Sequence, residues 1–98
     1  MNREKLEKLR QWAKDLRRQG GIKSADMEGL AQALGRKRHK RGKEPTWISE
    51  KFTDLRPVTI PHHSRDLNRF TALHILDQLE DDLDRYETEA TKKERGAR

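Results

Sequence analysis

The chain has 98 residues, of which 41% are charged and 31% hydrophobic, and its formal net charge is +6. This length suits one small domain that buries about two thirds of its unfolded surface, and so polar a composition leaves part of the chain in water. Since there is no cysteine, a disulfide framework, a thiolate metal site and a cysteine nucleophile are excluded. No apolar run approaches the roughly 18 residues of a membrane span, and the N-terminal sequence MNREKLEKLR lacks the apolar core of a signal peptide. We therefore expect a soluble, cytoplasmic protein.

Positive and negative charges are separated along the sequence. The segment from Asp77 to Ala90 holds seven acidic residues and one arginine, a local charge of −6, so the remaining chain carries +12. Six of the eight residues from Arg36 to Lys43 are lysine or arginine. This asymmetry indicates one face for a phosphate backbone and another that is solvated or meets a different partner. The alternative is that the charges simply keep a small domain in solution.

An amphipathic helix is predicted over residues 2–19. Apolar residues recur there at spacings of three and four, which places them on one stripe of a helix: Leu6, Leu9, Trp12, Ala13 and Leu16. Gly20 and Gly21 end this helix, because glycine readily takes the left-handed conformation that closes a helix. The stripe is either a core face or a groove for a partner.

Two further helices show the same spacing. One spans residues 24–34, with Ser24 as its N-cap. The other begins near residue 69 or 71 and ends at residue 87, with its acidic side chains facing water. Beyond it there is nothing to bury, so residues 88–98 are predicted to be a disordered basic tail.

Short strands are predicted between the second and third helices. Residues 35–43 suit an edge strand followed by a mobile basic loop, since like charges repel unless an anion lies among them. Residues 46–52 and 57–60 suit a hairpin with a turn between them. This order of elements predicts an α+β fold in which helices cover one face of a small antiparallel sheet of two to three strands. The other face of the sheet would then be open to a ligand.

Candidate chemical groups gather around these strands. His62 and His63 follow the last strand, and histidine suits proton transfer to or from ribose and phosphate oxygens, although such a pair also serves as a plain phosphate contact. Glu44, beside the basic loop, suits a general base, a loop anchor or a surface ion pair. Trp47 either stacks on a base or belongs to the core. Zinc binding by His39, His62 and His63 has weak support because no further ligand lies at suitable spacing, so no cofactor is expected.

The segment VTIPHHSRDLNRFTALHILDQLEDDL follows a known family pattern: a strand ending in IP or VP, a histidine, a short polar link, and a helix with Ile-Leu and Gln inside. The matching positions are Val58, Ile60, Pro61, His63, Leu67, Thr71, Ile75, Leu76 and Gln78. On these residues the stretch from Ser24 to Leu83 resembles the HicA family, the toxin half of bacterial type II toxin-antitoxin pairs. The fold of that family is similar to the double-stranded-RNA-binding domain.

This resemblance implies a metal-independent endoribonuclease that cuts mRNA, inhibits translation and is neutralised by a HicB-like antitoxin protein. It divides the chain into an N-terminal amphipathic helix (1–21), a HicA-like RNA-binding domain (22–87) and the tail (88–98). The family usually carries Gly-Ser-His where this chain has Gly42-Lys43-Glu44, so Glu44 takes the place of the catalytic histidine. The N-terminal helix is additional to the minimal family unit, and it completes the core, makes a homo-oligomer or meets the antitoxin.

The first hypothesis is therefore an RNA-binding toxin with Glu44 and His63 as candidate catalytic residues. The candidates for RNA binding are cationic, aromatic or imidazole side chains: Arg36, Lys37, Arg38, Lys40, Arg41, Lys43, Trp47 and His62. One alternative is a non-catalytic nucleic-acid-binding module of the same fold. Another is a protein that binds other proteins through its acidic third helix and its N-terminal stripe.

Overall fold

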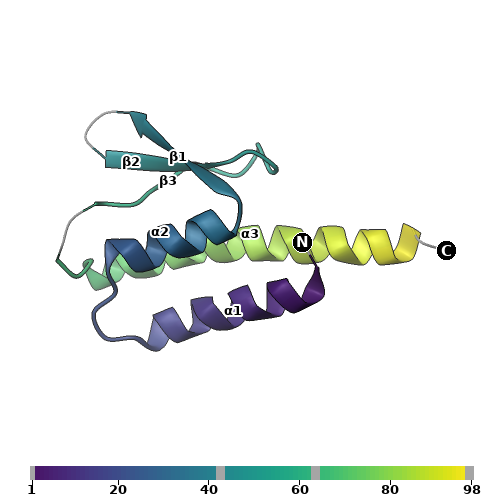
Figure 1. Ribbon diagram of the computed structural model, residues 1–98, viewed down its shortest axis with the longest axis horizontal. Coiled ribbons are helices and arrows are strands. Elements are labelled where there is room, and N and C mark those ends of the chain that lie inside the picture. Colours follow the sequence, from purple (N-terminus) through teal and green to yellow (C-terminus); the bar gives the residue numbers. More distant parts are fainter. Residues whose placement is uncertain (1, 42–43, 63–64, 97–98) are drawn as a thin grey trace.

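A computed structural model describes residues 2–41, 44–62 and 65–96 (Figure 1). The side chains of residues 40, 41, 44 and 93–96 are outside this description. The elements in chain order are α1 (Arg3–Arg18), α2 (Ser24–Ala33), β1 (Arg36–Arg41), β2 (Glu44–Ser49), β3 (Val58–Thr59) and α3 (Arg69–Gly96). Among the helices of the described residues, none combines the length and the apolar character needed to cross a membrane.

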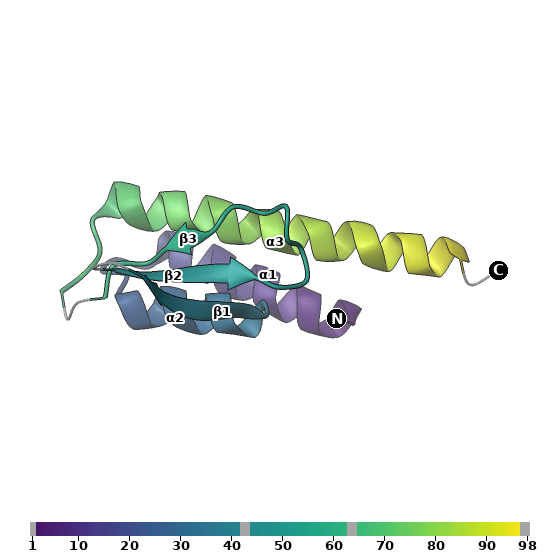
Figure 2. The same ribbon diagram turned by 90° about the horizontal axis from the view of Figure 1, so that it is seen from above.

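The elements form three layers, which Figures 1 and 2 show from two directions. The strands make one antiparallel sheet in the order β1-β2-β3, so β1 and β3 are its edges. α2 lies under β1 and α3 under β3, while α1 packs on both helices from the side away from the sheet. The predicted α+β fold with helices on one sheet face is confirmed. No described element covers the opposite face of the sheet.

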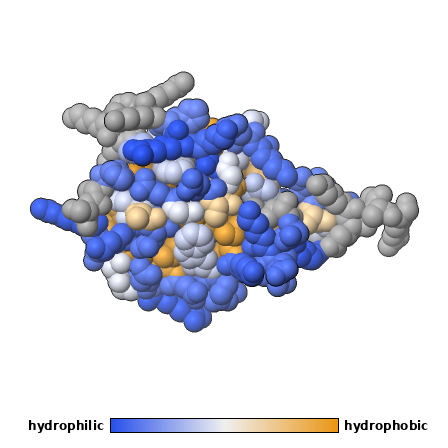
Figure 3. Space-filling view, in the orientation of Figure 1, coloured by the Kyte–Doolittle hydropathy of each residue, from blue (hydrophilic) through white to orange (hydrophobic). Residues whose placement is uncertain are grey.

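The apolar stripe of α1 is a core face. Leu6, Leu9, Ala13 and Leu16 are buried, as their spacing predicts, whereas Trp12 is 36% exposed. Trp12 lies over α2 at Gly29, where an added Cβ would stand 3.3 Å from the indole ring, so the glycine lets the two helices approach. Figure 3 shows exposed apolar surface in the middle of this side of the molecule, with hydrophilic surface above and below it.

The connection between α1 and α2 is fixed by the segment that precedes α3. Gly21 has a φ of +74°, and a Cβ added there would meet the Asp66 carboxylate at 2.7 Å. Lys23 forms an isolated bridge with Asp66, and the Leu67 N–H donates to the Ile22 carbonyl at 2.7 Å. Glycine is therefore needed at position 21 both for its backbone conformation and for this close approach.

The acidic surface of α3 is largely neutralised by α1. Arg10 and Arg17 each lie between two carboxylates of α3, with Arg10 at 3.0 Å from both of its partners. The four partners are Asp77, Glu80, Asp84 and Glu87. These side chains were predicted simply to face water, and the structure shows that they also hold the outer helix in place.

A buried ion pair joins the sheet to α3. Arg36, the first residue of β1, is 3% exposed and Asp82 is 1% exposed. The guanidinium donates to the two carboxylate oxygens at 2.7 and 2.8 Å, and also to the carbonyls of Trp47 and Arg56. Burial raises the pKa of the Asp82 carboxyl, and the hydrogen bonds from Arg36 oppose that rise. One side chain thus ties together β1, β2, the segment before β3, and α3.

The helix α3 is longer than the sequence predicts. It continues to Gly96, whereas residues 88–98 were expected to be a disordered tail. Glu89 pairs with Lys51 at 3.1 Å, and Ala90 packs against the core. Because glycine and proline are absent between residues 88 and 95, nothing in the sequence ends the helix earlier. The tail prediction is therefore wrong for residues 88–96, while residues 97 and 98 lie outside the description.

The strands also differ in length from their prediction. β2 begins at Glu44 and ends at Ser49, where the Ser49 hydroxyl accepts the Phe52 N–H at 3.1 Å and the chain turns away. β3 has only two residues and pairs with β2 through Thr46 and Trp47. The predicted hairpin is present, but the longer pairing is the one between the basic β1 and β2.

Loss of one member of the Arg36–Asp82 pair should be costly. We expect Arg36→Met or Asp82→Leu alone to lower the free energy of unfolding by about 3–5 kcal/mol, because each leaves an unpaired charge in the core. The double variant should lose clearly less than the two single losses added together. Urea denaturation of the four proteins measures this, with Arg85→Ala as the control, since its pair with Asp54 is exposed. Additive losses would mean that the two groups do not act as a pair.

Ionisation of Tyr86 should lower the stability of the fold at alkaline pH. Its hydroxyl donates to the Leu34 carbonyl at 2.8 Å, and burial raises its pKa above the ordinary value of about 10. The neutral phenol therefore contributes its full share of stability below about pH 10, and this contribution is lost as the pH rises through the pKa of Tyr86 in the folded protein. We expect the wild type to exceed Tyr86→Phe by about 1 kcal/mol at pH 8 and to lose this advantage above pH 10. Because Tyr86 is the single tyrosine, tyrosinate absorbance reports its titration directly, and an ordinary midpoint would contradict the prediction.

Candidate nucleic-acid interface

The register of the sheet divides the basic strand between two faces. Residues directly opposite in an antiparallel pair share a face, so Lys37 and His39 lie with Ile48 and Thr46 on the open face. The Lys37 and His39 side chains are both exposed. Lys37 also pairs with Glu50 at 3.2 Å across an exposed contact, which a polyanion can replace.

Arg38 points to the other face but stays accessible, because β1 is an edge strand. It is exposed and lines a hollow of about 580 Å³ between α2 and β1, together with Gln32, Gly35 and Trp47. Lys37, Arg38 and His39 therefore give this edge of the sheet positive or titratable groups on both faces. We call these three residues the basic edge.

Two residues predicted to bind RNA lie in the interior instead. Arg36 is enclosed by Asp82 and two backbone carbonyls, so its guanidinium is not available to a phosphate. Trp47 is 6% exposed and faces the helices, so it is a core residue and not a stacking platform. Within the described part of the chain its indole N–H has no hydrogen-bond partner. The predicted role of both residues is corrected here.

The segment that follows β3 lies at the end of the sheet where β2 begins. The Ile60 N–H donates to the Pro45 carbonyl at 3.3 Å, which places this segment beside the first residues of β2. Ser24 is not the N-cap that the sequence predicts, since the cap is Lys23; its hydroxyl donates to the Pro61 carbonyl. His62 thus stands, exposed, at the same end of the sheet as the backbone of Glu44.

The imidazole of His62 has a carboxylate partner that sequence reasoning did not identify. Its Nδ1 lies 3.3 and 3.4 Å from the two carboxylate oxygens of Glu28 on α2. These two residues lie 34 positions apart, and no local pattern in the sequence links them. A second unpredicted feature is Phe70, 85% exposed in the first turn of α3. It is the aromatic side chain most open to a ligand among the described residues.

Several candidates lie partly or wholly outside the described residues. Lys40, Arg41 and Glu44 belong to β1 and β2 by their backbone, with Arg41 opposite Glu44 in the register, but their side chains are outside the description. Lys43 and His63 lie outside it altogether. Across the described residues, no cluster of three or more histidine, cysteine or acidic side chains is arranged to hold a metal ion.

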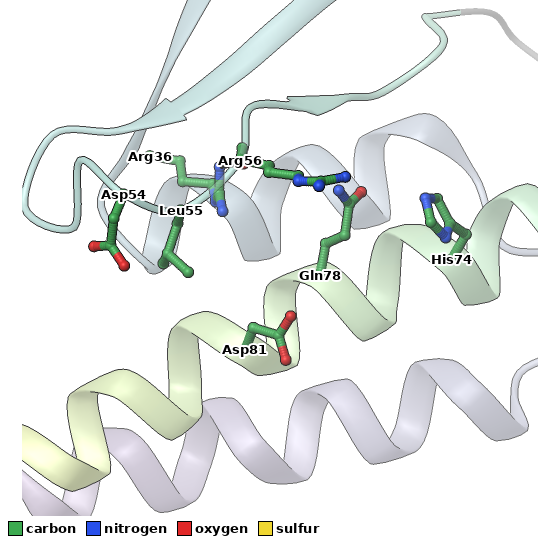
Figure 4. A pocket seen from close by; sticks show the side chains of 7 residues that line it. All are labelled: Arg36, Asp54, Leu55, Arg56, His74, Gln78 and Asp81. Carbon is green, nitrogen blue, oxygen red and sulfur yellow. Dashed lines mark hydrogen bonds between the residues drawn. The ribbon is translucent and has the colours of Figure 1, made fainter.

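A separate polar hollow of about 370 Å³ lies between α3 and the segment before β3 (Figure 4). Two of its lining residues already have ion-pair partners elsewhere: Arg36 pairs with Asp82, and Asp54 pairs with Arg85. The lining also includes Arg56, Gln78 and Asp81. The exposed Arg56 and Asp81 carry opposite charges on its two sides. Because its charges balance, this hollow lacks the excess of positive charge that the basic edge carries.

In comparisons with protein-family models, with curated proteins and with solved structures, no match to the chain is found.

Proposed function

We propose that the protein is a HicA-like toxin of a type II toxin-antitoxin system, a metal-independent endoribonuclease that acts on mRNA in the cytoplasm and inhibits translation. In this proposal α2, the sheet and α3 form a unit like the double-stranded-RNA-binding domain, and α1 is an addition that completes the core. A HicB-like antitoxin protein would neutralise it. The support is the order helix, three-stranded sheet, helix, together with the sequence resemblance around Pro61.

The observation that carries the proposal is the position of His62 relative to the basic edge. Lys37, Arg38 and His39 are exposed on an edge strand, and His62 is exposed at the end of the same sheet. Cationic side chains along the strand hold the RNA backbone without reading its sequence, and an imidazole or carboxylate at the end of the same sheet can take a proton from a ribose 2′-hydroxyl. Phe70 at the start of α3 offers a face on which an unpaired base can stack.

A second candidate function is a non-catalytic RNA-binding module. It is favoured by Glu44, which stands where the family carries its catalytic histidine. The interaction-protein alternative has less support, because the stripe of α1 is core and the acids of α3 are paired with Arg10 and Arg17.

Cleavage in the absence of metal separates the two functions. We expect the purified protein to cut a defined mRNA in excess EDTA and to leave 2′,3′-cyclic phosphate ends. Glu44→Ala and His63→Ala test the two candidate catalytic residues separately. Removing a residue that transfers a proton should lower the cleavage rate by about 100-fold, whereas removing one that does not should change the rate little. His74→Ala, which removes an exposed imidazole from α3, is the matched control and should cleave like the wild type. RNA that is bound but stays intact would establish the binding module instead.

The basic edge should set the salt dependence of binding. For a labelled single-stranded RNA, we expect log K to fall linearly with log salt, and the slope to shrink by about 0.7 for each phosphate contact removed. Lys37→Ala with Arg38→Ala should therefore flatten the slope by about 1.4. Lys14→Ala removes an exposed cation from α1, in the layer farthest from the sheet, and should leave the slope unchanged. An equal effect of the two changes would place the RNA elsewhere.

A further inference from the structure

Glu28 and His62 form a pair that joins α2 to the end of the sheet. The His62 Nδ1 lies 3.3 Å from one carboxylate oxygen of Glu28 and 3.4 Å from the other. The Glu28 side chain is 16% exposed and that of His62 is 61% exposed. A largely enclosed carboxylate therefore holds one edge of an imidazole whose remaining surface faces water.

The backbone next to His62 is held by the same face of α2. Ser24 and Glu28 are four residues apart, so their side chains lie one above the other on the helix. The Ser24 hydroxyl donates to the Pro61 carbonyl, directly before the histidine. On the far side of residues 63 and 64, the Leu67 N–H donates to the carbonyl of Ile22, two residues before α2 begins. The ring and the adjacent backbone are thus attached to one helix, which restricts His62 more than an ordinary surface loop would.

We propose that Glu28 is a positioning residue that makes the Nε2 of His62 the proton acceptor in RNA cleavage, an inference that rests on the function proposed above. A carboxylate accepts hydrogen bonds and has none to donate, so it selects the tautomer in which Nδ1 carries the proton. The lone pair of the neutral ring is then on Nε2. Since Nε2 lies across the ring from Nδ1, it is directed away from Glu28 and is available to a bound ligand.

The resulting step is a transesterification within the RNA. The 2′-oxygen forms a bond to the adjacent phosphorus while its proton passes to Nε2, and the bond from phosphorus to the 5′-oxygen breaks. The leaving oxygen takes a proton from water, and the hydroxide so formed recovers the proton from the imidazolium. The products are a 2′,3′-cyclic phosphate and a 5′-hydroxyl. During the step the Glu28 carboxylate stabilises the imidazolium, as a carboxylate does behind other catalytic histidines.

The tautomer can be measured without RNA. In long-range ¹H–¹⁵N spectra of the full chain, with the His62 resonances assigned through His62→Ala, we expect the neutral ring to carry its proton on Nδ1. Glu28→Ala should shift the ring toward the Nε2–H form. Glu28→Gln keeps an oxygen acceptor without the charge, so its proportion of the two tautomers should lie between those of the wild type and Glu28→Ala. Glu7→Ala removes an exposed carboxylate from α1 and should change nothing. A wild-type ring with its proton on Nε2, or a tautomer that ignores Glu28→Ala, overturns the inference.

Cleavage kinetics supply the second test. We expect Glu28→Ala to lower kcat on the order of 100-fold with little change in KM, because the change removes orientation of the acceptor and no RNA contact. In a His62→Ala background the same change should have no further effect, since the two residues act as one unit. An equal loss in both backgrounds would overturn the role of Glu28. If the wild type leaves the RNA intact, the ribonuclease function fails and the proton transfer with it, while the spectra still decide whether Glu28 orients the ring.

Discussion

The buried pair of Arg36 and Asp82 is the constraint on which the sheet depends. A guanidinium in the core is tolerable only if its donors are satisfied, and here they reach a carboxylate of α3 and the carbonyls of Trp47 and Arg56. This bonding fixes which way β1 faces. Because strand side chains alternate, an inward Arg36 requires Lys37 and His39 to point to the open side. The orientation of the accessible side chains on the basic strand is therefore decided by Arg36, which is itself buried.

Ion pairs within the molecule, including that of Arg36 and Asp82, explain the separation of charge in the sequence. The acidic segment of α3 has partners inside the molecule: Asp82 meets Arg36, four other carboxylates meet the arginines of α1, and Glu89 meets Lys51. These acids serve the packing of α1 and the sheet onto α3, whereas the pair that Lys37 of β1 makes with Glu50 is exposed to water. A chain with a moderate net charge of +6 can thus present a concentrated positive edge.

The sequence predicted what depends on local periodicity and failed where long-range partners decide. The spacing of Leu6, Leu9 and Leu16 and the glycines after it specify α1, and the run of like charges correctly marks an edge strand. Nothing local shows that Arg36 has a partner 46 residues away, or which face of β2 receives Trp47. The pairing of Glu28 with His62 spans 34 residues and was missed for the same reason. The length of α3 was underestimated because residues 88–96 show no apolar stripe of their own, whereas in the structure Glu89 pairs with Lys51 and the helix continues to Gly96.

The geometry around His62 depends on the turn between α1 and α2. Gly21 adopts a positive φ and leaves no room for a side chain beside Asp66, which lets the chain at Ile22 and Lys23 run against the segment before α3. That contact docks the segment on the start of α2, where Ser24 and Glu28 hold its other end at Pro61 and His62. α1 lies on the far side of the molecule from the sheet, yet its packing on α3 and the turn that follows it determine where α2 begins. A helix that touches no ligand in this proposal therefore contributes to the placement of the imidazole through its packing on α3 and the turn that follows it.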